Sequence, residues 1–256
     1  MNRYADIDLE EKRLPPIYGY WSHPLVSLEE ALKPIIPTID QLSRYIQVAK
    51  QHCHFPSEHG LTRDESAAVF LYTMEWGDKS FYRVFNQAVR SKDRRGLTPW
   101  FAFLKLFDTA LSKLPIVKKN VWRGVTGDLS KHFRKGKELI WWSVSSCSPS
   151  VDVIKTFLDN NSTLFMIEAL KGKDISSYTS FPDEQEVLLG LGTRLRVESN
   201  ALDHPGGLHV IHLIEINDNS GEELSSAMAQ THIEPPIDIK KKSSKYQIYF
   251  ILNKRS

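Results

Sequence analysis

The apolar residues of this 256-residue chain change their spacing near Pro115, and this change constrains the fold more than any other feature. Before Pro115, apolar side chains recur every three or four positions behind capping residues, as on the buried face of an amphipathic helix. After Pro115, short runs of branched and aromatic residues are separated by turn residues, as in strands. Helices followed by strands favour an α+β fold over alternating βαβ units.

The helices expected before Pro115 begin at hydroxyl residues, whose side chains can cap exposed backbone N–H groups. Ser27 and Glu30, for example, have the spacing of a capping box. Pro99 is compatible with a helix start because proline is accepted in the first turn. The second helix is expected to run from Thr38 to about Ala49. The expected starts are Ser27, Thr38, Thr62, Ser80 and Thr98.

After Pro115 the pattern predicts strands, with one short helix that begins at Ser148-Pro149. The expected strands are Val121–Val125, Leu139–Ser145, Thr163–Leu170, Glu186–Leu189, Arg194–Glu198, Leu208–Ile216 and Lys245–Leu252. This order predicts an N-terminal extension over residues 1–24, a helical region over 25–114 and a β-rich region over 115–256. Within the last region, the polar residues 218–244 are expected to form a surface loop.

Charge and cysteine content exclude several classes of protein. A net charge of +2 gives no support to a nucleic-acid binder. The two cysteines are too few for a disulfide framework, and no apolar run approaches the ~18 to 20 residues of a membrane span. The N-terminus also lacks the apolar run of a secretory signal. We therefore expect a soluble, cytoplasmic protein without nucleic-acid or membrane partners.

No metal site is expected either. The segment His52-Cys53-His54 offers ligands but lacks a second ligand pair at the spacing of a zinc site. His209 and His212 fall on an expected strand, where their side chains would point to opposite faces.

Two segments after Pro115 carry residues suited to binding a nucleotide. Arg123 and Gly124 lie in an expected strand; a guanidinium can donate two hydrogen bonds to phosphate oxygens, and a glycine lets a ligand approach the backbone. Alone, this signal is weak, since an arginine in a strand is usually a surface residue. The second segment, Trp141–Ser148, ends a strand in hydroxyl residues that could orient a carboxylate or meet a ribose. The alternative for Ser148 is a plain helix cap.

A third segment, Phe181–Leu189, contains two carboxylates, Glu184 and Glu186, where a proline-containing loop enters an apolar strand. In an extended backbone, residues two apart point to the same side, about 7 Å from each other. Such a pair suits chemistry in which positive charge develops on a substrate. A solvated end of a hairpin is the alternative.

In this order and spacing, the three segments resemble the arginine-specific mono-ADP-ribosyltransferases that carry an Arg–Ser–Glu triad. The resemblance is clearest over residues 121–198, and the helical half resembles the region that precedes the core in eukaryotic members. It implies a β-rich core of two packed sheets that binds NAD+ as co-substrate and needs no metal.

The resemblance also implies roles on the NAD+ side of the site. Arg123 would hold the pyrophosphate, and Gly124 would offer backbone groups to the nicotinamide carboxamide. Ser146 would orient the catalytic acid, and Phe181 would cover the nicotinamide ring. Glu186 would bind the ribose and stabilise the oxocarbenium ion that forms as nicotinamide leaves.

On the acceptor side, the resemblance assigns Glu184 to the arginine that receives ADP-ribose. A guanidinium is protonated at neutral pH and is a poor nucleophile, so a second acid is needed to orient it and accept its proton. The sequence departs from the family pattern at Val144, where Phe is frequent, and at Cys147, where Thr is frequent.

The sequence therefore predicts an NAD+–protein-arginine ADP-ribosyltransferase whose partners are NAD+ and a protein with an exposed arginine. An NAD+ glycohydrolase using the same residues, with water in place of arginine, remains an alternative. A catalytically silent NAD-binding module is a third. The sequence leaves the acceptor protein and the oligomeric state open.

Overall fold

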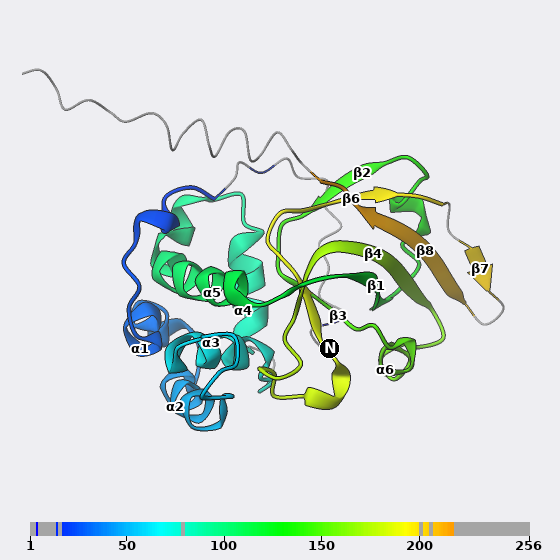
Figure 1. Ribbon diagram of the computed structural model, residues 1–256. Helices are drawn as coiled ribbons and strands as arrows, with labels where there is room; N and C mark the ends of the chain where they lie inside the picture. The colour runs from blue at the N-terminus through cyan, green and yellow to red at the C-terminus, as the bar shows by residue number, and fades with distance from the viewer. Residues whose placement is uncertain are drawn as a thin grey trace, which may run out of the picture. The chain divides into compact units, whose positions relative to one another are not determined.

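The computed structural model describes residues 4, 14, 17–77, 80–199, 202–204 and 207–217, and it contains helices in the first half and strands in the second (Figure 1). The surface loop expected over residues 218–244 and the strand expected at Lys245–Leu252 lie outside the described residues. The α+β class predicted from the sequence is confirmed, because α5 ends at Lys113 and β1 begins at Ile116, on either side of Pro115.

The helical half contains α-helices and short 3₁₀ helices in sequence. They are η2 (Tyr20–Ser22), α1 (Leu28–Leu32), η3 (Ile36–Thr38), α2 (Leu42–His52), α3 (Arg63–Thr73), α4 (Phe81–Val89), η4 (Arg95–Trp100) and α5 (Phe101–Lys113). The starts expected at Ser27 and Thr62 are confirmed, since each hydroxyl accepts a hydrogen bond from the backbone three residues later. None of the described helices has the length and apolar character that a membrane span requires.

The start expected for the second helix is wrong. Thr38 ends the 3₁₀ helix η3, and its hydroxyl donates to the Ile35 carbonyl instead of capping a new helix. α2 begins only at Leu42, because Gln41 adopts a left-handed backbone conformation with φ of 55°. The local hydrogen bond of a threonine side chain competes with its use as a cap.

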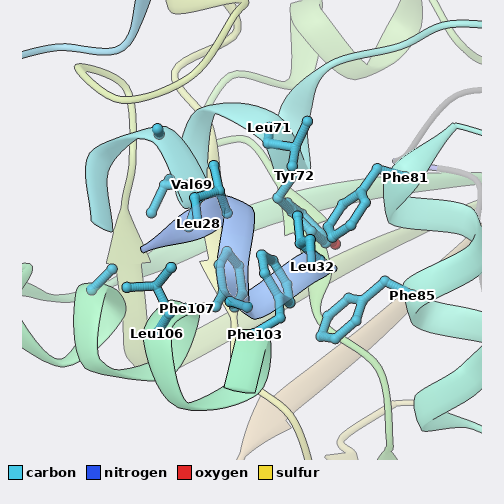
Figure 2. Close-up of a cluster of buried hydrophobic side chains, with 14 of the residues drawn as sticks. Leu28, Leu32, Val69, Leu71, Tyr72, Phe81, Phe85, Phe103, Leu106 and Phe107 are labelled. Carbon is cyan, nitrogen blue, oxygen red and sulfur yellow. The ribbon is translucent and has the colours of Figure 1, made fainter. Parts of the chain in front are cut away.

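Aromatic rings hold the helices together. Figure 2 shows the rings of Phe81, Phe85, Phe103 and Phe107 gathered between α4 and α5. The ring centroid of Phe103 lies 4.8 Å from that of Phe81 and 5.3 Å from that of Phe85, both in edge-on contact. Tyr72, on α3, packs in the same cluster, and its hydroxyl donates to the Val144 carbonyl in the second half of the chain. The helical core is therefore tied directly to the β-rich region.

The second half contains strands and two further 3₁₀ helices around one short α-helix. They are β1 (Ile116–Thr126), η5 (Ser130–His132), β2 (Glu138–Trp141), β3 (Ser145–Cys147), α6 (Val151–Lys155), β4 (Ser162–Asp174), η6 (Pro182–Glu184), β5 (Val187–Leu189), β6 (Thr193–Val197), β7 (Leu202–His204) and β8 (Leu208–Glu215). The single strand expected over Leu139–Ser145 is two strands, because β2 pairs with β6 whereas β3 pairs with β5.

The strands follow the order β2-β6-β8-β4-β5-β3, with β1 paired to β4 and β7 paired to β8. β4 changes neighbours along its length. Its first half lies between β1 and β8, and its last residues, Lys173 and Asp174, pair with β5. The two packed sheets expected from the resemblance are thus found only in part. The described strands form one curled sheet, in which β4 pairs with β8 along its first half and with β5 at its end. The change of neighbours brings β3 and β5 close to β1.

Candidate active site

Arg123 lies on the inward face of β1 and is one of the largest fully buried side chains in the described part of the chain. Its Nη1 donates a hydrogen bond of 2.6 Å to the Ser146 carbonyl oxygen on β3. Its guanidinium also lies over the Trp141 ring, 5.7 Å from the ring centroid. Because a buried charge is costly, a guanidinium held at this depth from two sides is suited to binding an anionic group of a ligand.

Ser146 is fully buried on β3, where it pairs with Leu188 of β5. Its backbone oxygen receives the bond from Arg123, but its Oγ has no hydrogen-bond partner among the described residues. Buried hydroxyl groups in proteins are nearly always hydrogen-bonded. The Ser146 hydroxyl is therefore a position at which a polar atom of a bound ligand fits.

Glu186 is fully buried immediately before β5. Its Oε2 accepts a hydrogen bond of 3.2 Å from the Thr179 hydroxyl, and its carbonyl accepts one of 3.0 Å from the Ile175 N–H. Burial raises the pKa of the neighbouring Cys147 thiol to about 12, while the charges of Arg123 and Glu186 act on it in opposite directions. Arg123 and Glu186 are thus both buried next to β3. Arg123 donates to the Ser146 carbonyl, and Glu186 directly precedes Val187, which pairs with Cys147.

Glu184 has a different setting from Glu186. It ends the 3₁₀ helix η6 and is partly exposed. Its Oε2 accepts a hydrogen bond of 3.1 Å from the Tyr4 hydroxyl, and its backbone oxygen accepts one of 2.8 Å from the Ser148 hydroxyl. Ser148 is therefore more than the helix cap that was one reading of the sequence, since the residue at the N-cap of α6 is Ser150.

The extended geometry expected for the two acids is wrong. Pro182 to Glu184 form a helical turn, and Gln185 has a left-handed conformation with φ of 50°. Proline fixes its own φ near the helical value and so favours the turn. The two carboxylates are not successive side chains on one face of a strand; one is buried and the other reaches toward the surface.

Gly124 packs against α6. A Cβ atom at this position would lie 2.5 Å from Leu158 Cδ2 and 2.8 Å from Ile154 Cγ2, closer than real Cβ atoms come to their neighbours. The structure therefore gives the glycine a packing reason, which differs from the close approach of a ligand expected from the sequence. Phe181 lies at the start of the turn that carries Glu184, with 36% of its surface exposed.

Tyr4 is a contact of the site that sequence reasoning missed. It is fully buried, and its ring stacks on Phe157 with centroids 5.1 Å apart. The two rings belong to an apolar cluster with Ile154 and Leu164, beside the turn that carries Glu184. No motif marks an isolated tyrosine some 180 positions away from its partner, so pattern reasoning had no signal for it.

The described residues contain no group of three or more His, Cys, Asp and Glu side chains that could hold a metal ion. His54, from the candidate segment in the helical half, instead forms a 2.7 Å contact with Glu58. On β8, His212 contacts Glu168 at 2.7 Å, and His209 lies 3.7 Å from Asp128.

Comparison with known proteins gives three kinds of match. The sequence profile of the family described as NAD:arginine ADP-ribosyltransferase matches residues 29–221. Mav of Mycobacterium avium (strain 104), named for a proposed NAD(+)–arginine ADP-ribosyltransferase activity, is 32% identical over 164 residues, which are 63% of this chain and 19% of Mav. The chain therefore spans about a fifth of the length of that curated relative.

Solved structures share the fold. The eucaryotic mono-ADP-ribosyltransferase ART2.2 superposes with a TM-score of 0.54 at 20% identity, over 75% of this chain and 84% of that one. Vis toxin, an ADP-ribosyltransferase from Vibrio splendidus, gives a TM-score of 0.51 at 20% identity over 80% and 93%. Exoenzyme S from Pseudomonas aeruginosa, in complex with human 14-3-3 protein beta, gives a TM-score of 0.54 at 18% identity, over 81% of this chain and 99% of that one. At these identities the structural likeness shows the fold alone.

Proposed function

The chain belongs to the NAD:arginine ADP-ribosyltransferase family, and from that premise we propose that it transfers ADP-ribose from NAD+ to the guanidinium of a protein arginine. The observation that carries the proposal is the unlike setting of the two acids. Glu186 is fully buried just before β5, whereas Glu184 is partly exposed in the turn that precedes it. A transferase of this kind needs one acid for the departing nicotinamide and another for the incoming arginine.

On the NAD+ side, Arg123 supplies a fixed positive charge for the pyrophosphate, since Ser146 and Trp141 already hold its guanidinium. The Ser146 hydroxyl, which lacks a partner among the described residues, supplies a hydrogen bond to the bound nucleotide or to the acid beside it. The contacts that hold Arg123 are made to residues of the curled sheet itself, so little reorganisation is required on binding.

In the first chemical change, the bond between the anomeric carbon and the nicotinamide nitrogen breaks, and its electron pair leaves with nicotinamide. Positive charge develops on the ribose, as in glycoside hydrolysis. The carboxylate of Glu186, buried and held by Thr179, stabilises that charge. A preorganised carboxylate in a site of low dielectric is a larger stabilising contribution than the same group in water.

In the second change, a guanidine nitrogen of the acceptor forms the new bond to the anomeric carbon, and a proton must leave that nitrogen. Glu184 accepts the proton, because its partly exposed carboxylate can meet a side chain that arrives from another protein. An acceptor with an exposed arginine fits this geometry.

Hydrolysis of NAD+ is the second candidate function, and one observation favours it. The Tyr4 hydroxyl already donates to Glu184 Oε2, so a guanidinium has to share that carboxylate or displace the tyrosine. Water needs no such exchange and could attack the same ribose.

Glutamine variants of the two acids test the proposal. Glu186→Gln is expected to lower nicotinamide release by at least about 100-fold, as for other groups that stabilise charge in a transition state. Glu184→Gln is expected to suppress transfer to a guanidine while much NAD+ hydrolysis continues. Asp183→Asn, in the same turn and exposed, is the matched control. Equal loss of both reactions in Glu184→Gln would remove Glu184 from the acceptor side.

A further inference from the structure

Three successive residues in the segment between β4 and β5 make hydrogen bonds in different directions. Tyr178 bonds to the helical half, Thr179 bonds to Glu186, and Ser180 bonds to the helical half again. The hydroxyl that contacts the buried acid is therefore flanked on both sides by attachments to a part of the chain that carries none of the triad residues.

The first attachment is the phenol of Tyr178. It lies 2.7 Å from Ser57 Oγ and 2.9 Å from His59 Nδ1, and its ring is buried beside His54 with centroids 5.4 Å apart. Ser57 is itself fixed, because its Oγ accepts hydrogen bonds from two backbone N–H groups, those of His59 and Leu61. The Tyr178 phenol thus contacts a hydroxyl, that of Ser57, whose orientation is fixed by the backbone of the segment before α3.

The second attachment is Ser180. Its backbone N–H donates a hydrogen bond of 2.9 Å to Thr73 Oγ1, and the two hydroxyl oxygens lie 3.2 Å apart. Thr73 is the last residue of α3 and is fully buried. Its hydroxyl lies 2.8 Å from the Phe70 carbonyl, to which it donates within the same helix.

Between the attachments, the Thr179 hydroxyl donates to Glu186 Oε2 at 3.2 Å and accepts the Phe181 N–H at 3.2 Å. The side chain is nearly fully buried, so water cannot easily replace either bond. The Thr179 hydroxyl thus links Glu186 to the turn that carries Glu184. The backbone position of Thr179 is set by the attachments of its two neighbours to the helical half.

We propose that Thr179 is a positioning residue for Glu186, and that the helical half acts on the reaction through it by anchoring Tyr178 and Ser180. This inference rests on the proposed role of Glu186 in nicotinamide release. A hydroxyl donor on Oε2 fixes the plane of the carboxylate and directs Oε1 toward the ribose. Loss of this hydrogen bond removes one restraint on the carboxylate, and misplacement of a reacting group by about 1 Å is enough to cost about 100-fold in rate.

The test separates the hydroxyl from the volume of the side chain. Thr179→Val keeps the shape and removes the hydroxyl, and Thr179→Ser keeps the hydroxyl and removes the methyl group. For Thr179→Val we expect kcat for nicotinamide release to fall by about 10- to 100-fold with KM for NAD+ changed much less, since Arg123 is untouched. Thr179→Ser should restore most of the kcat.

Tyr178→Phe tests the anchor, and Tyr45→Phe is its matched control, because Tyr45 also lies in the helical half but stacks on Trp76. We expect Tyr178→Phe to lower kcat in the same direction as Thr179→Val and to accelerate amide hydrogen exchange over residues 176–184. Tyr45→Phe should do neither.

The inference is overturned if Thr179→Val keeps the kcat of the wild type, whatever happens to its melting temperature, or if Thr179→Ser is as slow as the valine variant. It is also overturned if Tyr178→Phe changes neither kcat nor exchange. Failure of the proposed function would look different. If the chain only hydrolysed NAD+, nicotinamide would still be released and the comparison of the Thr179 variants would stand. If the wild type and every variant released no nicotinamide, the inference would fall with the proposed role of Glu186.

Discussion

Exchange of Gly124 for alanine tests whether the end of β1 is shaped by its contact with α6. The added Cβ would meet two side-chain carbons, Leu158 Cδ2 at 2.5 Å and Ile154 Cγ2 at 2.8 Å. Ile154 is fully buried, so it cannot move into solvent to make room. An extra methyl group in a packed site forces neighbouring side chains off their preferred rotamers, which costs about 1–3 kcal/mol.

The expected loss is measurable by unfolding. For a chain of this size, each 1 kcal/mol lowers the melting temperature by about 2–4 °C, so Gly124→Ala should melt about 2–12 °C below the wild type. Urea unfolding should give the matching fall in the free energy of unfolding. The double variant Gly124→Ala/Leu158→Ala should lose less stability than the sum of the losses of the two single variants, because Leu158→Ala removes the side chain that the new methyl group meets.

Gly190→Ala is the control for this experiment. A Cβ at Gly190 has no neighbour within 4 Å, and the residue does not have the positive φ that would make alanine strained. We expect its stability to equal or slightly exceed that of the wild type, since alanine restricts the unfolded chain. A Gly124→Ala variant that melts with the wild type and with Gly190→Ala would refute the packing argument.

Three further exchanges have defined outcomes. Tyr4→Phe frees Glu184 Oε2 from a hydrogen bond worth about 0.5–1.5 kcal/mol, so KM for a guanidine acceptor should fall roughly 2- to 10-fold; a higher KM would mean that the tyrosine orients the acid instead. Lys113→Met leaves the buried carboxylate of Glu65 without its 2.6 Å ion partner and should lower the free energy of unfolding by about 2–3 kcal/mol, which urea titration measures. This is less than for a fully buried pair, because the lysine is one-third exposed. Burial raises the pKa of the Cys147 thiol from 9.0 to about 12. Only the unfolded thiol ionises between those pH values, so the free energy of unfolding should decline there by up to ~1.4 kcal/mol per pH unit, and less steeply in Cys147→Ala. Equal slopes in the wild type and in Cys147→Ala would contradict the raised pKa of the Cys147 thiol.

The local signals in the sequence predicted the order of elements well. The capping residues Ser27 and Thr62 mark helix starts because their hydrogen bonds are made within a few residues. Pro115 marks the change from helix to strand because its ring disfavours a helical backbone at the residue before it, and Leu114 is indeed extended. The segments that carry Arg123, Ser146 and Glu186 were each weak signals alone, and only their order and spacing indicated a site.

The sequence could not predict how those segments meet. β3 and β5 are three residues each, too short for a periodic pattern, and they come together only because β4 exchanges one neighbour for another. Left-handed conformations at Gln41 and Gln185 were unexpected, since residues other than glycine rarely adopt them. The contacts of Tyr4 and Thr179 with the two acids are side-chain contacts without a sequence motif.

The most direct test of the account is to incubate the purified wild-type chain with NAD+ and agmatine, a small guanidine, and to measure nicotinamide and ADP-ribosyl-agmatine together by mass spectrometry. The account predicts that ADP-ribosyl-agmatine forms faster than free ADP-ribose, so that the nicotinamide released beyond hydrolysis is matched by an equal amount of adduct. It also predicts that Glu186→Gln abolishes both nicotinamide release and adduct formation. Nicotinamide accompanied only by free ADP-ribose would contradict the arginine acceptor and favour a glycohydrolase, and neither product from the wild type would contradict catalysis altogether.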